Sequence, residues 1–154
     1  MSTKIQDTNL PSAALQPFLG PHQFAVLRAA LRGEEKTYFS ATLVDLAALI
    51  ATMPQTGEQD GLGDAATVSL HYFAGGSANW WIMEKDAGDG TEDNGQHQAF
   101  GLANLFGGPT SPDAELGYIS IAEILAHGGE LDLHFTPTTL GQLQGRTAPL
   151  SDHN

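Results

Sequence analysis

Four side chains in the second half of the chain could do acid–base chemistry: Glu84, Glu115, Asp132 and His134. Two carboxyl groups, or a carboxyl group and an imidazole, act as general acid and general base when they lie in one cleft. The chain has no Gly-x-Ser-x-Gly motif and no phosphate-binding glycine loop to supply a nucleophile or a cofactor site around them. We therefore predict no cofactor, and a small metal- or ligand-dependent enzyme built on these four residues is an alternative to a non-catalytic protein.

Two features invite a metal-binding interpretation. The acidic, glycine-rich segment 86–95 has the ingredients of a calcium loop, but its carboxylates lack the alternating spacing of an EF-hand and its predicted flanks are strands. A solvated hairpin loop is favoured over a weak cation site. None of the six histidines has His-x-His or His-x-x-x-His spacing. His71 and His134 each adjoin an aromatic residue in a predicted strand and could approach each other across a sheet, where a structural role is favoured, so no metal site is predicted.

The charge is strongly negative, with 18 Asp and Glu against 6 Lys and Arg. Proteins that hold nucleic acid cluster Lys and Arg to neutralise phosphates, so direct nucleic-acid binding is not expected. An acidic surface favours either solubility alone or docking to a basic protein partner. Core packing is the default role of the tryptophans, but an exposed one would be an anchor for a partner. The predicted partner-binding residues are Glu58, Asp60, Asp64, Asp86, Asp89, Glu92, Asp93, Trp80 and Trp81.

The elements that must position these residues begin with two helices. Apolar residues recur at helical spacing over 21–33, and Pro21 is suited to the first position of a helix. A second helix is predicted after Ser40, an N-cap candidate, and ends at Pro54. Segment 55–66 carries three glycines among carboxylates and is expected to be an exposed loop.

The hydrophobic period then changes to two, which predicts strands over 68–73 and 79–85 joined as a hairpin. Large side chains alternate on both faces of the second strand, which predicts a position inside the sheet. Further strands are expected over 99–105, 117–121 and 131–135, a short helix over 122–126, and one helical turn within 138–143. The predicted fold class is α+β: two N-terminal helices followed by a mostly antiparallel sheet of about five strands with a short helix inserted.

The length of 154 residues fits one domain. We predict a flexible N-terminal arm over 1–20, a single α+β domain over 21–145 and a polar tail over 146–154. No apolar run approaches the length that a bilayer requires, and no secretory signal is evident at the N-terminus, which predicts a cytoplasmic location. The oligomeric state is left open.

Four segments resemble a family of small proteins of unknown activity from bacterial plasmids, integrative elements and phages. They are Trp80-Trp81-Ile82-Met83-Glu84-Lys85-Asp86, Phe100-Gly101-Leu102, Glu115-Leu116-Gly117-Tyr118-Ile119-Ser120 and Glu130-Leu131-Asp132-Leu133-His134-Phe135-Thr136-Pro137. The resemblance implies an accessory protein of a mobile element. With the negative charge, it favours an inhibitor of a defence nuclease, of the anti-CRISPR or anti-restriction type, that blocks a basic nucleic-acid-binding surface of a CRISPR effector or restriction–modification subunit. A structural or regulatory subunit of a plasmid-borne complex is the other alternative.

Overall fold

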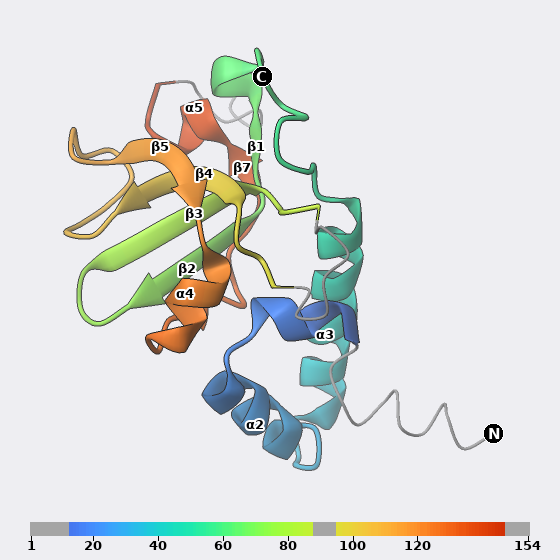
Figure 1. Ribbon diagram of the computed structural model, residues 1–154. Helices are drawn as coiled ribbons and strands as arrows, with labels where there is room; N and C mark the ends of the chain where they lie inside the picture. Colours follow the sequence, from blue (N-terminus) through green and yellow to red (C-terminus); the bar gives the residue numbers. More distant parts are fainter. Residues whose placement is uncertain (1–12, 88–94, 147–154) are drawn as a thin grey trace, which may run out of the picture.

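A five-stranded antiparallel sheet forms the centre of the protein in a computed structural model that describes residues 13–87 and 95–146 (Figure 1). Its spatial order is β5-β4-β3-β2-β6, so consecutive strands are mostly neighbours. A separate two-stranded sheet pairs β1 with β7. The strands are β1 (Thr67–Val68), β2 (Leu70–Ala74), β3 (Ala78–Glu84), β4 (Ala99–Asn104), β5 (Glu115–Ile119), β6 (Glu130–Leu131) and β7 (Thr138–Thr139).

Helices precede the sheet and interrupt it, which confirms the predicted α+β class. The two longest, α2 and α3, stand beside the sheet, and α4 follows β5 directly (Figure 1). None of the helices in the described part of the chain has the length and apolar character needed to cross a bilayer. The helical elements are η1 (Ala13–Phe18), α2 (Pro21–Ala30), α3 (Lys36–Thr52), η2 (Gly63–Ala65), α4 (Ile121–Ala126) and α5 (Leu140–Leu143).

The predicted hairpin is confirmed as β2 and β3, both inside the sheet. Successive side chains of a strand point to opposite faces. On one face, Ile82 belongs to the larger core, which η1, α2, α3 and α4 supply, and Trp80 packs against it. On the other face, Trp81 and Met83 belong to a smaller core with residues of β1 and α5. The alternation of large side chains along β3 therefore reflects two cores, one on each side of the sheet.

The N-terminal arm differs from the prediction over residues 13–20. These residues contain η1, and Leu15, Phe18 and Leu19 are buried in the larger core. The spacing of these three side chains places them on one side of a helical turn, and the Phe18 carbonyl accepts a hydrogen bond of 2.7 Å from the Tyr72 hydroxyl. The ordered domain thus begins before residue 21. Residues 1–12 and 147–154 lie outside the described part of the chain.

Several element boundaries also differ from the prediction; for example, the strand expected over 117–121 is β5, Glu115–Ile119. Helix α3 begins at Lys36 rather than after Ser40, because the turn that follows α2 already leads into it: the Lys36 N–H bonds to the Gly33 carbonyl. Strand β6 ends at Leu131 instead of continuing to residue 135. There the Asp132 carboxylate accepts the His134 N–H at 3.0 Å, a local turn that carries the chain away from the sheet.

Candidate functional site

The acid–base candidate Glu84 is a buried structural residue with 3% of its surface exposed. Its carboxylate accepts the N–H of Gly57 at 2.7 Å and the N–H of Gln59 at 3.0 Å. The Gln59 side chain in turn bonds to the main chain of Thr67 and Met83. These contacts fix part of the segment that was expected to be an exposed loop, so Glu84 anchors the loop and has no open side for a substrate.

The predicted acidic partner surface divides into parts with different surroundings. Glu58 and Asp60 are exposed. The Arg146 guanidinium contacts the Asp64 carboxylate at 2.6 Å, and its hydrogen bonds hold the pKa of Asp64 below the usual value. Asp86 accepts the main-chain N–H groups of two residues across its loop, at 3.2 and 3.0 Å. The other three predicted carboxylates, Asp89, Glu92 and Asp93, lie outside the described residues. The segment 86–95, suggested as a cation site, lies partly outside them.

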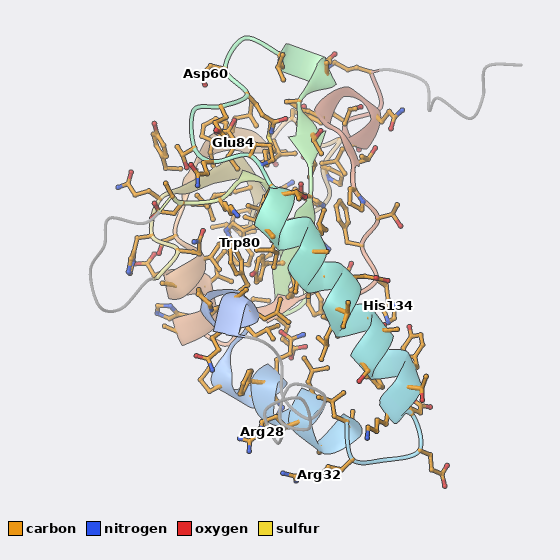
Figure 2. All side chains as sticks on the ribbon, turned by 90° about the vertical axis from the view of Figure 1, so that its right-hand side faces the viewer. Arg28, Arg32, Asp60, Trp80, Glu84 and His134 are labelled. Atoms are coloured by element: carbon orange, nitrogen blue, oxygen red, sulfur yellow. The ribbon has the colours of Figure 1, made fainter. Side chains whose placement is uncertain are left out.

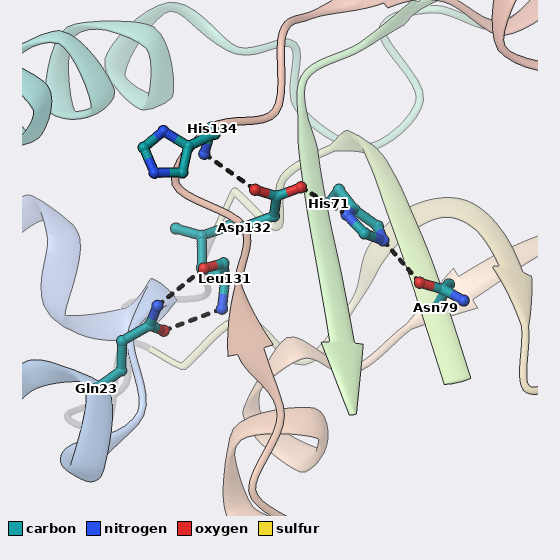
Figure 3. A network of polar contacts seen from close by, with 6 residues as sticks. All are labelled: Gln23, His71, Asn79, Leu131, Asp132 and His134. Carbon is teal, nitrogen blue, oxygen red and sulfur yellow. Dashed lines mark hydrogen bonds and ion pairs between the residues drawn. The ribbon is translucent and has the colours of Figure 1, made fainter. Parts of the chain in front are cut away.

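A chain of polar contacts crosses one face of the sheet (Figure 3). Asp132 contacts Nδ1 of His71 at 3.0 Å, and Nε2 of His71 lies 2.8 Å from Oδ1 of Asn79. The Asn79 amide donates to the Gly107 carbonyl at 2.9 Å. Both ring nitrogens of His71 are therefore engaged, and the imidazole stacks on Trp81 with ring centroids 5.3 Å apart. This arrangement joins β6, β2 and β3 to the loop after β4.

The four acid–base candidates do not form one site. Asp132 is only partly open to water, and its bond to the His134 N–H brings these two together. Glu115 is exposed on β5, at the opposite edge of the sheet from β6, four strand spacings or about 19 Å away. Glu84 is enclosed by its loop. Within the described ranges, no group of three His, Asp or Glu side chains is arranged to hold a metal ion.

Neither tryptophan is an exposed anchor. Trp81 is 4% exposed and its ring fills the smaller core against His71, which gives no support to its predicted role as a partner anchor. Trp80 is half-buried and lies toward the interior, between the sheet and the helices (Figure 2). Its remaining open surface lines a hollow at the β5 side of the sheet.

Two adjoining open hollows, of about 670 and 440 Å³, meet at β5, and together they are called here the β5 groove. All of β5 lines the first hollow, and residues of α4 line the second. The residues common to both hollows are Trp80, Ala103, Leu105, Tyr118 and Ile119.

Large apolar side chains are exposed around the β5 groove. Phe106 is 82% exposed and Tyr118 is 69% exposed, with Leu105 and Leu116 about half exposed. The loop that carries Leu105 and Phe106 is nevertheless held in place. The buried Asn104 side chain accepts the Phe106 N–H at 2.9 Å and donates to the Gly108 carbonyl at 2.9 Å. The groove thus displays apolar groups on a main chain that is fixed by hydrogen bonds.

The rim of the groove is acidic. Asp113 and Glu115 line the first hollow and Glu123 lines the second, while neither hollow is lined by Lys or Arg. No ion pair neutralises these three carboxylates among the described residues. The exposed basic residues Arg28 and Arg32 lie at the far end of the protein from Asp60 and Glu84 (Figure 2).

Sequence reasoning missed the groove. Residue 105 was expected at the end of a strand, and no binding role was predicted for Leu105, Phe106 or Tyr118. The signal available was an apolar pair placed directly before Gly107-Gly108-Pro109, because large apolar side chains in a glycine–proline loop have no regular element to bury them.

Comparison of the chain with protein-family models, with curated proteins and with solved structures gives no match. The resemblance to proteins of mobile elements therefore stays a prediction.

Proposed function

We propose that this protein is a non-catalytic binding protein that docks a basic protein partner in the β5 groove. The observation that carries the proposal is the exposure of four large apolar side chains at the β5 edge: Leu105 and Phe106 beside the groove, and Leu116 and Tyr118 on the other face of β5. Aromatic side chains in and beside a pocket are the groups that most often dominate binding energy at protein interfaces. Exposed apolar groups that gather in one place mark interaction sites more often than isolated ones do.

The charge of the groove determines the kind of partner. Asp113, Glu115 and Glu123 surround an apolar floor, and the whole chain carries a formal charge of −12. Such a surface attracts a basic partner over a distance and repels nucleic acid. The binding site thus differs from the two acidic loops first considered, because an apolar contact supplies affinity while carboxylates at its rim supply attraction.

The resemblance to mobile-element proteins names the first partners to test: the basic nucleic-acid-binding surfaces of defence nucleases, including CRISPR effectors and restriction subunits. In this proposal the protein occupies such a surface in the cytoplasm of a bacterial host. A regulatory subunit of a plasmid-borne complex would use the same groove, and its captured partners would be proteins of that complex. The dispersed positions of Glu84, Glu115 and Asp132 give no support to the enzyme alternative.

The test compares three purified baits. They are the wild-type protein, the double variant Phe106→Ser with Tyr118→Ser, and the control Val44→Ser on α3, where Val44 is 66% exposed. Proteins captured from a nuclease-treated bacterial lysate are identified, and each is produced in pure form for a binding titration at several salt concentrations. We expect a basic protein whose affinity falls at least about tenfold for the double variant, which is about 1.4 kcal/mol, and is unchanged for the control.

Salt separates the two contributions. Attraction between exposed charges is screened at higher ionic strength, so affinity should fall as salt is added. A partner that binds all three baits equally, or whose affinity is indifferent to salt, would contradict the proposed site or its electrostatic component, respectively.

A further inference from the structure

The two edge strands of the main sheet, β6 and β5, differ in whether their outward main-chain groups are hydrogen-bonded. At the β6 edge, the Gln23 side chain of α2 donates to the Leu131 carbonyl at 2.8 Å and accepts the Leu131 N–H at 2.9 Å (Figure 3). Those two contacts occupy the main-chain groups that another strand would use. At the β5 edge, the strand pairs with β4 on one side, and no described strand pairs with its other side.

The open edge is long enough to pair. Strand β5 has five residues, while β6 has two. An uncovered edge strand presents a row of unpaired N–H and C=O groups, and natural proteins usually block such edges with charge, proline, a bulge or a cover. Only Glu115 among the five β5 residues carries a charge, and two of the five are the exposed Leu116 and Tyr118.

The side chains of β5 show what an added strand would meet on each face. Ile119 belongs to the larger core, so Glu115 and Gly117 point to the same face as Ile119 and line the groove. A Cβ atom on Gly117 would meet no atom within 4 Å, so this face has room for a long side chain. Leu116 and Tyr118 point to the opposite face, where the Tyr118 and Phe100 rings meet edge-to-face with their centroids 5.7 Å apart.

We infer that the partner binds by adding an extended segment to β5 as a sixth strand, with basic side chains toward the groove and apolar side chains toward Leu116 and Tyr118. This inference rests on the proposed function and specifies how the groove is used. Main-chain hydrogen bonds supply affinity in this mode of recognition, and alternate side chains supply specificity. On the groove face, the basic residues of the added segment lie beside Glu115 and over Gly117. On the opposite face, its apolar residues form cross-strand pairs with Leu116 and Tyr118.

A second copy of the chain is the competing occupant. Each copy carries a formal charge of −12, so two copies repel each other as they approach. An edge with Glu115, flanked by Asp113 and Glu123, instead favours a segment of opposite charge.

The experiment uses the full chain with synthetic heptapeptides labelled with a fluorophore. The test peptide alternates lysine and valine. Its controls are a glutamate–valine peptide of the same pattern and a peptide of the test composition with its valines contiguous. We expect the alternating basic peptide to bind at least about tenfold more tightly than either control by fluorescence anisotropy, and to slow hydrogen exchange of amides in β5.

Methylation of the peptide nitrogens tests the main-chain pairing directly. In an antiparallel pair only alternate residues direct their N–H groups toward the neighbouring strand. One peptide is methylated at its odd positions and a second at its even positions. Strand addition requires that one set abolishes binding and the other leaves most of it. Equal effects of the two sets, or equal affinity for the alternating and contiguous peptides, would overturn the inference.

The outcomes distinguish this inference from the proposed function. A natural partner that depends on Phe106 and Tyr118 but leaves β5 amide exchange unchanged would retain the docking site and refute strand addition. Protection of β5 amides in the free protein, together with a dimer mass in solution, would assign the edge to a second copy and refute both the basic segment and its site.

Discussion

The two edge strands of one sheet, β6 and β5, have opposite surroundings. Strand β6 is short, both the N–H and the C=O of Leu131 are hydrogen-bonded to the Gln23 side chain, and the turn at Asp132 follows directly. Strand β5 is longer, none of the described strands pairs with its outer side, and exposed apolar side chains lie around it. Glu84 and Asp132, which first suggested chemistry, stabilise the closed parts of the fold, whereas Glu115 lies at the open edge, where we propose that the partner binds.

The largest expected difference is between two glycines that face each other on neighbouring strands, Gly101 and Gly117. A Cβ atom on Gly101 would overlap the main-chain carbonyl of Trp81, while one on Gly117 would meet open space. We expect Gly101→Ala to lower the free energy of unfolding by at least about 4 kcal/mol, and Gly117→Ala to change it by less than about 1 kcal/mol. Urea unfolding followed by circular dichroism measures both, and similar losses would show that the β5 edge is as tightly packed as β4.

A second comparison concerns two glutamates. Removing the Glu84 carboxylate leaves the N–H groups of Gly57 and Gln59 without their acceptor in a buried place. We expect Glu84→Ala to cost about 3 kcal/mol of unfolding free energy, because charged acceptors contribute more than neutral ones. Glu115→Ala should cost less than about 0.5 kcal/mol and should weaken binding of the basic peptide. If Glu84→Ala weakens peptide binding without loss of stability, the division between closed and open regions is wrong.

Local pattern was enough to predict the class of fold and most of its elements. Alternation along β3 placed Trp80 and Trp81 on opposite faces, and Pro21 marked the start of α2. The elements missed depend on contacts between distant residues. Leu15, for example, is buried in a core whose other residues come mostly from distant parts of the sequence.

The site was less predictable for the same reason. Glu84 and Glu115 are chemically identical in the sequence, and only the sheet order and the loop that closes over Glu84 separate their roles. Exposure of Phe106 likewise depends on the path of the loop after β4, which the Asn104 side chain holds in place. The net negative charge could be predicted from composition. The position of the β5 groove, where carboxylates border exposed apolar side chains, could not.

The closed edge can be opened by changing Gln23. Because both Leu131 contacts come from this side chain, Gln23→Ala should lower the free energy of unfolding by about 1–2 kcal/mol. Gln23→Glu, unlike Gln23→Ala, retains the acceptor for the Leu131 N–H and loses only the donor to the Leu131 carbonyl. Hydrogen exchange at the Leu131 amide should be faster in Gln23→Ala than in the wild type, while peptide binding at β5 stays unchanged. Loss of peptide binding in Gln23→Ala would mean that the two edges are coupled.

The smallest expected effect is on the pH dependence of stability, and it compares the buried Tyr72 with the exposed Tyr118. Burial raises the pKa of Tyr72 well above 10.0, and its hydroxyl donates to the Phe18 carbonyl, whereas Tyr118 is exposed. At neutral pH, Tyr72→Phe should cost about 1 kcal/mol through the lost hydrogen bond. A folded-state pKa above the unfolded value means that this tyrosine's contribution is complete below about pH 10 and is lost as pH rises further, by up to about 1.4 kcal/mol per pH unit. Urea unfolding at increasing pH should therefore show the difference between wild type and Tyr72→Phe shrinking above about pH 10 and closing by about pH 11. The matched variant Tyr118→Phe, at an exposed position, is the control for effects of high pH on the rest of the protein. A difference for Tyr72→Phe that stays constant through this range would show that the Tyr72 hydroxyl has access to water.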